Sequence, residues 1–439
     1  MSSFFVHTFG CRCNQSDSAA IREQLARSRR SESGAAEDAD LVVVNTCTVT
    51  HRTDRQVRQA VRRLRRVNPG ARLVVTGCYA ERDPSALASI PGVDLVVGNA
   101  DKERIAELVD QAEAAGSETR GRIIRSPLDA ARDYLVAPMS RTGGRTRPFV
   151  KIQDGCDAAC SYCVIPAVRG PGRGARPEEI LGEVRRLVEQ GYQEIVLTGV
   201  HLGTYGTRFA RPTSLAALLE DILATPRLGR LRLSSIEPMR FSREIVELAA
   251  GHEAFARHFH IPMQSGSDRI LRRMRRPYTA ARFLELLGTI AERIPGVCLG
   301  TDAIVGFPGE TDSDFERTCE LVESSPLGYA HVFPFSAREG TDAWSLPHPV
   351  PLAVVRERAR LLREITRRKN LAFRQRFAGQ ELPALTLAPE EEMGESVVLT
   401  DNYIQARTPG FDLPPNRLVR ARIERVEHEA TLATITSPE

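Results

Sequence analysis

The chain has 439 residues and a formal net charge of +4, with 42% hydrophobic and 26% charged residues, a balance typical of globular domains. So small a net charge does not by itself require a polyanionic partner, and no apolar run reaches the ~18 residues that span a bilayer. The start, residues 1–5, also lacks the basic and apolar regions of a secretion signal, so we expect a cytoplasmic protein with no membrane partner.

The first hundred residues alternate strand and helix patterns. They predict strands at 4–9, 41–45, 73–76 and 95–97, with helices at 16–28 and 54–67. Continuous apolar strands alternating with helices indicate a parallel sheet covered on both faces. Cys11, Cys47 and Cys78 each follow one of the first three strands. Because parallel strands end at one edge of the sheet, where α/β sheets bind ligands, we expect these cysteines to converge there.

Residues 113–141 show weak periodicity and predict a linker. A strand–helix rhythm then resumes, and Ile180, Val184 and Leu187 form the apolar face of one of its helices. Six such units are too few for a closed eight-unit barrel, so an open, partial (βα)6 barrel is expected, with chemistry at the strand ends. The predicted strands are 149–153, 194–198, 231–235, 258–262, 297–305 and 329–333.

The pattern changes again after an Arg/Glu-rich helical stretch at 352–378. Val419, Ala421 and Ile423 alternate with charged residues, a period of two that predicts a half-buried strand. We expect residues from about 380 to the end to form a small all-β module.

A second set of cysteines lies directly after the first predicted barrel strand. Cys156, Cys160 and Cys163 have no fourth cysteine or histidine nearby, and the next histidine along the chain is His201. A disulfide framework is not expected in a reducing cytoplasm. Two interpretations stay open: a zinc site with a distant fourth ligand, or a four-iron cluster that keeps one iron open because three thiolates hold it.

This stretch resembles the radical S-adenosylmethionine (SAM) enzymes, whose signature is C-x3-C-x2-C with an aromatic residue before the last cysteine. Tyr162 stands at that place. The resemblance implies that SAM chelates the open iron of a [4Fe-4S] cluster and is cleaved to a 5′-deoxyadenosyl radical. The cofactor would carry the difficult chemistry, and the protein would position it.

The segments around the first three cysteines, FGCRCNQSDS, VVVNTCTVT and VVTGCYAE, resemble the N-terminal domain of the methylthiotransferases. The resemblance implies a second, auxiliary [4Fe-4S] cluster at Cys11, Cys47 and Cys78, and two SAM per turnover. It implies an N-terminal cluster domain over 1–112, a radical SAM core over 142–371 and a C-terminal TRAM-like RNA-binding domain over 374–439. Cys13 departs from the family pattern and is expected to be a spectator thiol.

Further motifs bear on the substrate: KIQDGC, GYQEIVLTGVHLGTYG, LSSIEP and HIPMQSGSD. With NTCTVT, they resemble the methylthiotransferases that act on N6-threonylcarbamoyladenosine at position 37 of tRNA. That tRNA is the implied partner, with an electron donor of the flavodoxin or ferredoxin type. The alternatives are a ribosomal-protein methylthiotransferase and a non-catalytic zinc and RNA-binding protein.

The candidate SAM-contacting residues follow barrel strands or lie in the cysteine loop, and several rest on the same resemblance. It places the methionine part of SAM near the end of the second barrel strand, and the adenine near residues 304–311. For the polar side chains among them, an ordinary surface role is the alternative. The candidates are Tyr162, Ile165, Gly199, Ser235, Glu237, Gln264, Ser265 and Val305.

Arginines in the C-terminal module are the candidate RNA contacts, because small β modules grip RNA backbones through basic faces. They are Arg407, Arg417, Arg420 and Arg422.

Overall fold

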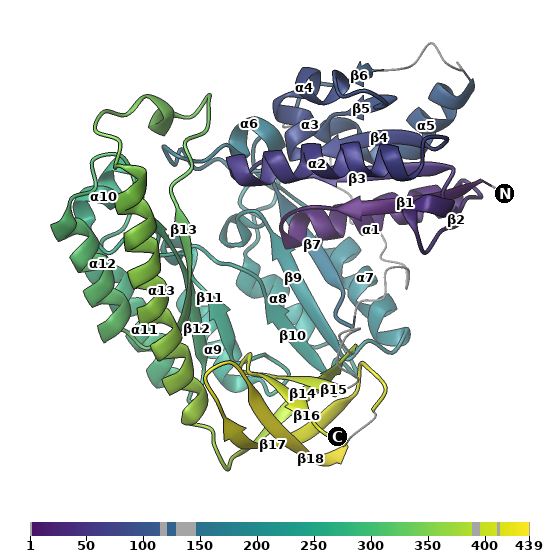
Figure 1. Ribbon diagram of the computed structural model, residues 1–439. Helices are drawn as coiled ribbons and strands as arrows, with labels where there is room; N and C mark the ends of the chain where they lie inside the picture. The colour runs from purple at the N-terminus through teal and green to yellow at the C-terminus, as the bar shows by residue number, and fades with distance from the viewer. Residues whose placement is uncertain (1, 115–120, 129–145, 389–395, 411–412, 439) are drawn as a thin grey trace.

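The computed structural model describes residues 2–114, 121–128, 146–388, 396–410 and 413–438. An N-terminal α/β domain lies against an open barrel, and a small β barrel closes the other end (Figure 1). These three parts confirm the predicted fold class. No helix in the described ranges is long and apolar enough to cross a bilayer.

The N-terminal domain is built on a six-stranded sheet whose neighbouring strands are all parallel. Its order is β2-β1-β3-β4-β5-β6. The short strand β6 lies inside the expected linker and pairs with β5, so that part of the linker is wrong; most of the remainder lies outside the described residues. The bounds are β1 Ser3–Thr8, β2 Ser31–Glu32, β3 Leu41–Thr46, β4 Arg72–Gly77, β5 Leu95–Val97 and β6 Arg122–Ile124.

Helices cover both faces of this sheet, which explains its continuous apolar strands. Leu41 and Val43 pack on the side of α1 (Arg12–Arg27) and α5 (Ile105–Ala114). Val42 and Val44 pack on the opposite side, against α2 (His51–Val67), α3 (Cys78–Arg82) and α4 (Pro84–Ala88).

Six parallel strands form the open barrel, and all six were predicted. They are β7 Phe149–Asp154, β9 Glu194–Gly199, β10 Arg230–Leu233, β11 His258–His260, β12 Cys298–Val305 and β13 Leu327–Pro334. Isolated bridges join β10 to β11, and the short β8 (Arg173–Gly174) pairs antiparallel with β7. Helices α7 (Pro177–Glu189), α8 (Leu215–Leu223), α9 (Arg243–Gly251), α11 (Ala280–Arg293) and α12 (Asp312–Ser324) alternate with the strands, and their apolar faces complete one core.

The long helix α13 (Leu352–Gln375) leads to a closed five-stranded barrel. Its strands are β14 Glu381–Leu387, β15 Ser396–Thr400, β16 Gln405–Thr408, β17 Leu418–Val426 and β18 Thr431–Pro438. Val419, Ala421 and Ile423 are all buried, as their alternation predicted. Arg232 of β10 anchors this barrel by donating to the carbonyls of Thr400 and Asp401.

Candidate functional site

The N-terminal cysteines follow β1, β3 and β4, which are neighbours in the sheet, so the parallel topology brings them to one edge as predicted. The approach between their loops is close. At Gly10, whose φ is +96°, a Cβ would lie 2.6 Å from the Cβ of Cys47 and 2.9 Å from its Sγ. Cys47 and Cys78 are buried, whereas Cys11 is exposed.

Asn14 ties these loops together and was not predicted from the sequence. Its fully buried side-chain amide donates to the carbonyls of Phe9 and Thr46, both at 2.8 Å. Its Oδ1 accepts from the thiol of Cys78 at 3.8 Å. One side chain therefore connects the loops that follow all three strands.

The thiols at this edge differ in their ease of ionisation. A hydrogen bond from Cys13 lowers the pKa of Cys11 to about 5, whereas burial raises the pKa of Cys47 to about 12. The Sγ of Cys13 also lies 3.8 Å from the Oγ1 of Thr198, on the barrel. A bound metal is the usual means of keeping a buried thiol deprotonated.

The second triplet lies in the loop between β7 and α6 (Ile165–Arg169). The amide of Cys156 donates to the carbonyl of Gly170 at 3.0 Å, and that of Cys163 to the carbonyl of Cys160 at 3.1 Å. Burial raises the pKa of Cys163 to about 12 and also raises that of Cys156. These bonds fold the loop back on itself directly after β7, and its three thiols are partly exposed.

Arg276 contacts this triplet, and the sequence analysis did not find it. Its Nη1 donates to the Sγ of Cys160 at 3.3 Å, and its Nη2 pairs with the carboxylate of Glu237. The guanidinium also lies 5.1 Å from the ring centroid of Tyr278. Burial raises the pKa of Glu237, although Arg276 opposes the shift. This places a predicted site carboxylate next to the thiols.

Each cysteine triplet is wider than a site for one ion. In the described part of the chain, three ligand atoms of His, Cys, Asp or Glu residues lie within 4.8 Å of one another at His260, Asp302 and His331, and at neither cysteine triplet. A single tetrahedral zinc, with Zn–S near 2.3 Å, would hold its thiolates about 3.8 Å apart. As they lie in this structure, the three thiols of neither triplet form a single-ion zinc site.

A pocket of about 220 Å³ is lined by residues from the loops of both triplets. The loop after Cys47 contributes Val49 and Thr50 to its lining, and the loop of the second triplet contributes Cys163 itself. Cys78 packs against residues of the same loop and of α6, such as Val164. The other lining residues are Tyr162, Val164, Ile165, Gln264, Asp302, Ile304, Phe333, Pro334, Phe335 and Ser336.

The predicted SAM contacts lie in several different places. Tyr162, Ile165 and Gln264 line the pocket, and Glu237 lies beside Cys160 through Arg276 as described. Val305 is instead packed in the core, because alternate strand residues face opposite sides and Ile304 takes the pocket side.

The remaining three candidates lie off this pocket. The buried hydroxyl of Ser265 accepts from the amide of Ser267 at 3.2 Å, within the fold. Ser235 is exposed beyond the end of β10, and Gly199 ends β9, where a Cβ would lie 2.8 Å from Leu202.

Asp302 connects this pocket to the interior of the barrel. Its Oδ1 lies 2.9 Å from the Nε2 of His260 and 3.4 Å from the Nδ1 of His331. Burial would raise the pKa of Asp302, but hydrogen bonds from both histidines outweigh it and hold the pKa well below its ordinary value. These three residues were not predicted, because they lie on three different strands.

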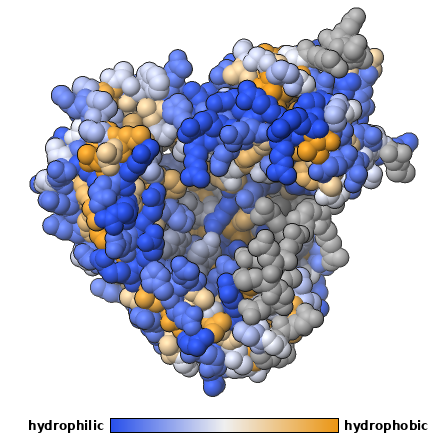
Figure 2. All heavy atoms as spheres, in the orientation of Figure 1, coloured by the Kyte–Doolittle hydropathy of each residue, from blue (hydrophilic) through white to orange (hydrophobic). Residues whose placement is uncertain are grey.

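A groove of about 700 Å³ runs between β13, α13 and the C-terminal barrel. His331 belongs to its lining, so the groove and the pocket meet at the His331–Asp302 contact. Of the four candidate RNA-binding arginines, Arg407 lines the groove, with the unpredicted Arg367 of α13. Figure 2 shows a largely hydrophilic face that is hollowed where the three domains meet.

The other candidate arginines lie on the outside of the C-terminal barrel. Arg417 and Arg422 are exposed. Arg420 is half-buried and pairs with Glu381 at 3.1 Å, which reduces its availability to a ligand.

Comparison with protein families gives two matches. Residues 3–98 match a family described as the uncharacterized protein family UPF0004, and residues 150–322 match the radical SAM superfamily. Among solved structures, the chain is similar to the radical S-adenosylmethionine methyltransferase TsrM from Kitasatospora setae, with a TM-score of 0.57 and 16% identity. That match covers 76% of this chain and 73% of the other, and it shows the fold alone.

Full-length relatives are more informative. The chain is 36% identical to the threonylcarbamoyladenosine tRNA methylthiotransferase MtaB of Bacillus subtilis, over 96% of this chain and 94% of the relative. It is 36% identical to the protein of the same name from Aquifex aeolicus, over 95% and 98%. A tRNA-2-methylthio-N(6)-dimethylallyladenosine synthase from Moorella thermoacetica is 33% identical, over 97% and 96%.

Proposed function

The chain belongs to the radical SAM methylthiotransferases, and we propose that it converts N6-threonylcarbamoyladenosine at position 37 of tRNA to its 2-methylthio derivative. Relatives that carry this activity in their names align with nearly the whole chain at 36% identity. The observation that carries the proposal is the shared pocket, which the loop after Cys47 and the loop of Cys163 line from two sides. Sulfur insertion requires both loops to reach one substrate atom.

A [4Fe-4S] cluster and SAM follow from membership of the radical SAM superfamily. We assign that cluster to Cys156, Cys160 and Cys163, and an auxiliary [4Fe-4S] cluster to Cys11, Cys47 and Cys78. When bound, these groups supply a sulfur atom, a methyl group from one SAM and a hydrogen-abstracting radical from a second, with electrons from a flavodoxin or ferredoxin. The two triplets fit such clusters because each offers three thiols, which would leave one iron of a four-iron cluster open to a small molecule.

The described side chains then have binding and positioning roles, and no side-chain general base is needed. Tyr162, Ile165 and Ile304 supply an apolar lining suited to an adenine ring. Glu237 and Arg276 place a carboxylate and a guanidinium beside Cys160, where the polar amino-acid end of SAM would bind.

The groove at the C-terminal barrel is the proposed path for the tRNA. Arg367 and Arg407 would contact phosphates from its two walls. A nucleotide that entered along it would meet His331 and Asp302 just before the pocket. The exposed Arg417 and Arg422 would extend this contact, and the cytoplasm, where tRNA is found, is the expected location.

Anaerobic turnover with defined substrates tests the proposal. Reconstituted protein, SAM and a reductant are incubated with tRNA that carries threonylcarbamoyladenosine, tRNA that carries dimethylallyladenosine, or ribosomal protein. Mass spectrometry of nucleosides and peptides should detect a methylthio product only with the first. A product on either of the others would refute the substrate assignment.

A matched variant separates catalysis from RNA binding. Cys160→Ala should abolish the product while tRNA affinity is retained. Metal analysis then decides against the non-catalytic alternative: about four iron and four sulfide per cluster are expected, rather than zinc.

A further inference from the structure

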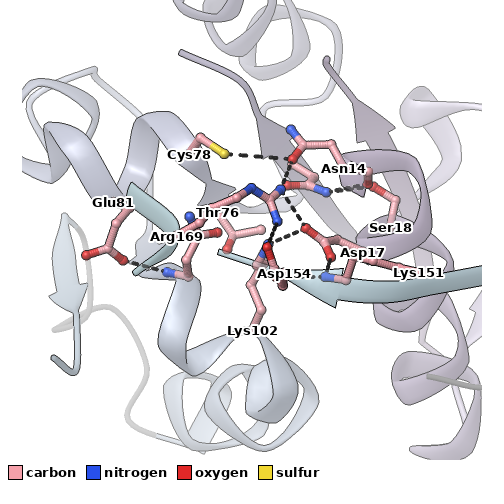
Figure 3. Close-up of polar contacts among 12 residues, drawn as sticks. Asn14, Asp17, Ser18, Thr76, Cys78, Glu81, Lys102, Lys151, Asp154 and Arg169 are labelled. Carbon is pink, nitrogen blue, oxygen red and sulfur yellow. Dashed lines mark hydrogen bonds and ion pairs between the residues drawn. The ribbon is translucent and has the colours of Figure 1, made fainter. Parts of the chain in front are cut away.

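A buried group of charged residues lies between the N-terminal domain and the barrel (Figure 3). We name it the interface charge cluster: Asp17, Lys102, Lys151, Asp154 and Arg169, all buried. The Nη1 of Arg169 donates to Asp154 at 2.8 Å and its Nη2 to Asp17 at 3.0 Å. Lys102 and Lys151 also pair with Asp17, and Lys151 lies 3.0 Å from Asp154. In a chain with three lysines, two are in this cluster.

The interface charge cluster joins the two domains next to both cysteine triplets. Asp17 lies on α1, which begins directly after Cys11. Asp154 is the last residue of β7, two positions before Cys156, and Arg169 is the last residue of α6, which follows the same cysteine loop. Each end of the loop that carries Cys156, Cys160 and Cys163 is thus tied through Arg169 to the helix that begins directly after Cys11.

Arg169 has one further contact that reaches the auxiliary site directly. Its Nη2 donates to the Oδ1 of Asn14, the oxygen that also accepts from Cys78 (Figure 3). Because Asn14 links the loops after all three N-terminal strands, the position of the guanidinium is transmitted to each of them. A planar guanidinium can serve three acceptors at once, whereas a lysine ammonium on a flexible stem cannot hold the same geometry.

The net positive charge of the interface charge cluster is also consistent with its position beside the two cysteine triplets. Three cations outnumber two carboxylates among its members, and Arg173 adds a fourth cation 3.7 Å from Asp154. An unbalanced buried charge is costly unless a counter-charge lies near. A four-iron cluster in its common oxidised state with three thiolate ligands has a net charge of about −1. Burial alone would raise the pKa of Asp17, but Lys102, Lys151 and Arg169 outweigh it and hold the pKa well below its ordinary value.

We infer that Arg169 is a positioning residue, which holds the loops of the two cysteine triplets at a set separation and orientation across the domain interface. The inference rests on the proposed function, because only a reaction that uses both sites needs their separation controlled. A misplacement of about 1 Å can lower the rate of a positioned reaction by about a hundredfold. Loss of Arg169 should therefore uncouple SAM cleavage from sulfur insertion before it removes either cluster.

The test compares Arg169→Lys and Arg169→Met with Arg232→Lys as a matched control. Arg232 is likewise fully buried and pairs with Glu194, but it anchors the C-terminal barrel, away from the triplets. Hydrogen exchange of the anaerobically purified protein should quicken about tenfold in segments 9–18 and 154–170 in the Arg169 variants. In Arg232→Lys these segments should keep the wild-type rate.

The second readout is the ratio of 5′-deoxyadenosine to methylthio product. It should rise about tenfold or more in Arg169→Lys, with iron content unchanged, and stay at the wild-type value in a second control, Arg30→Lys. The buried guanidinium of Arg30 pairs with Asp110 and Glu113 inside the N-terminal domain. An unchanged ratio in Arg169→Lys, or unchanged exchange in segment 9–18 of both Arg169 variants, overturns the inference. If Arg169→Met does not fold, Arg169→Lys decides alone.

Failure of the proposed function is recognised separately. In that case the wild-type protein gives no methylthio product on threonylcarbamoylated tRNA, whatever the state of Arg169. The exchange rates of the two segments then still decide whether Arg169 couples the loops.

Discussion

Gly10→Ala should remove the auxiliary cluster and leave the radical SAM cluster in place. A Cβ at this position would lie 2.6 Å from the Cβ of Cys47, whereas carbon atoms prefer a separation of about 3.5–4.0 Å. Cys47 must then move by about 1 Å, several times the ~0.2 Å tolerance of metal–ligand distances. The φ of +96° adds a backbone penalty of about 1–2 kcal/mol for any residue other than glycine.

Iron and sulfide analysis after anaerobic reconstitution measures this effect. The wild-type protein should bind about eight iron per chain and Gly10→Ala about four, while reductive cleavage of SAM without tRNA continues. Gly34→Ala is the control, because that position in the same domain has an ordinary φ and no atom within 4 Å of an added Cβ. Retention of about eight iron by Gly10→Ala would refute the steric reasoning, and so would equal losses in the two variants.

Three further predictions concern the anchor, the pocket and the groove. Burial opposes ionisation of Glu194, but Arg232 lowers its pKa from 4.5 to about 2, so about 3 kcal/mol of stability is present above pH 4.5 and lost as pH falls toward 2. Other buried carboxylates such as Asp302 also lose stability in this range, so the loss measured by urea unfolding should be smaller by about 3 kcal/mol in Glu194→Gln than in the wild type; an equal loss in the two would contradict the assignment. Ile304→Trp should fill the pocket and weaken SAM binding at least about tenfold in equilibrium dialysis. The control Ile304→Val should bind SAM normally, and equal affinity of the two variants would exclude this pocket as the SAM site. Arg407→Ala should weaken tRNA binding and reduce the steepness of log affinity against log salt concentration by about one. Arg420→Ala should change this slope less, because Arg420 is ion-paired. A larger change in Arg420→Ala than in Arg407→Ala would show that the RNA does not bind in the groove.

Local sequence patterns were enough to predict most elements of this fold. Strands such as β9 carry an apolar run of their own, and the alternation around Ala421 marks one face of β17 as buried. The edge strand β6 was not predicted, because it has three residues whose side chains are mostly exposed and therefore show no hydrophobic pattern. The segment 304–311 was expected near the adenine, but its sequence could not show which side chain faces the pocket: adjacent strand residues face opposite sides, so Val305 packs in the core and Ile304 lines the pocket.

The two cysteine triplets, their order and the parallel-strand topology that gathers the first of them were properties of the sequence, because strand periodicity and ligand spacing are local. Tertiary structure alone decided the contacts that connect the triplets. Arg169 meets Asn14 and Asp17 across more than 150 residues of chain, and Arg276 meets Cys160 across 116. An arginine has no periodicity that marks it as a bridge, so its role emerges only when burial removes water and leaves those partners as its acceptors.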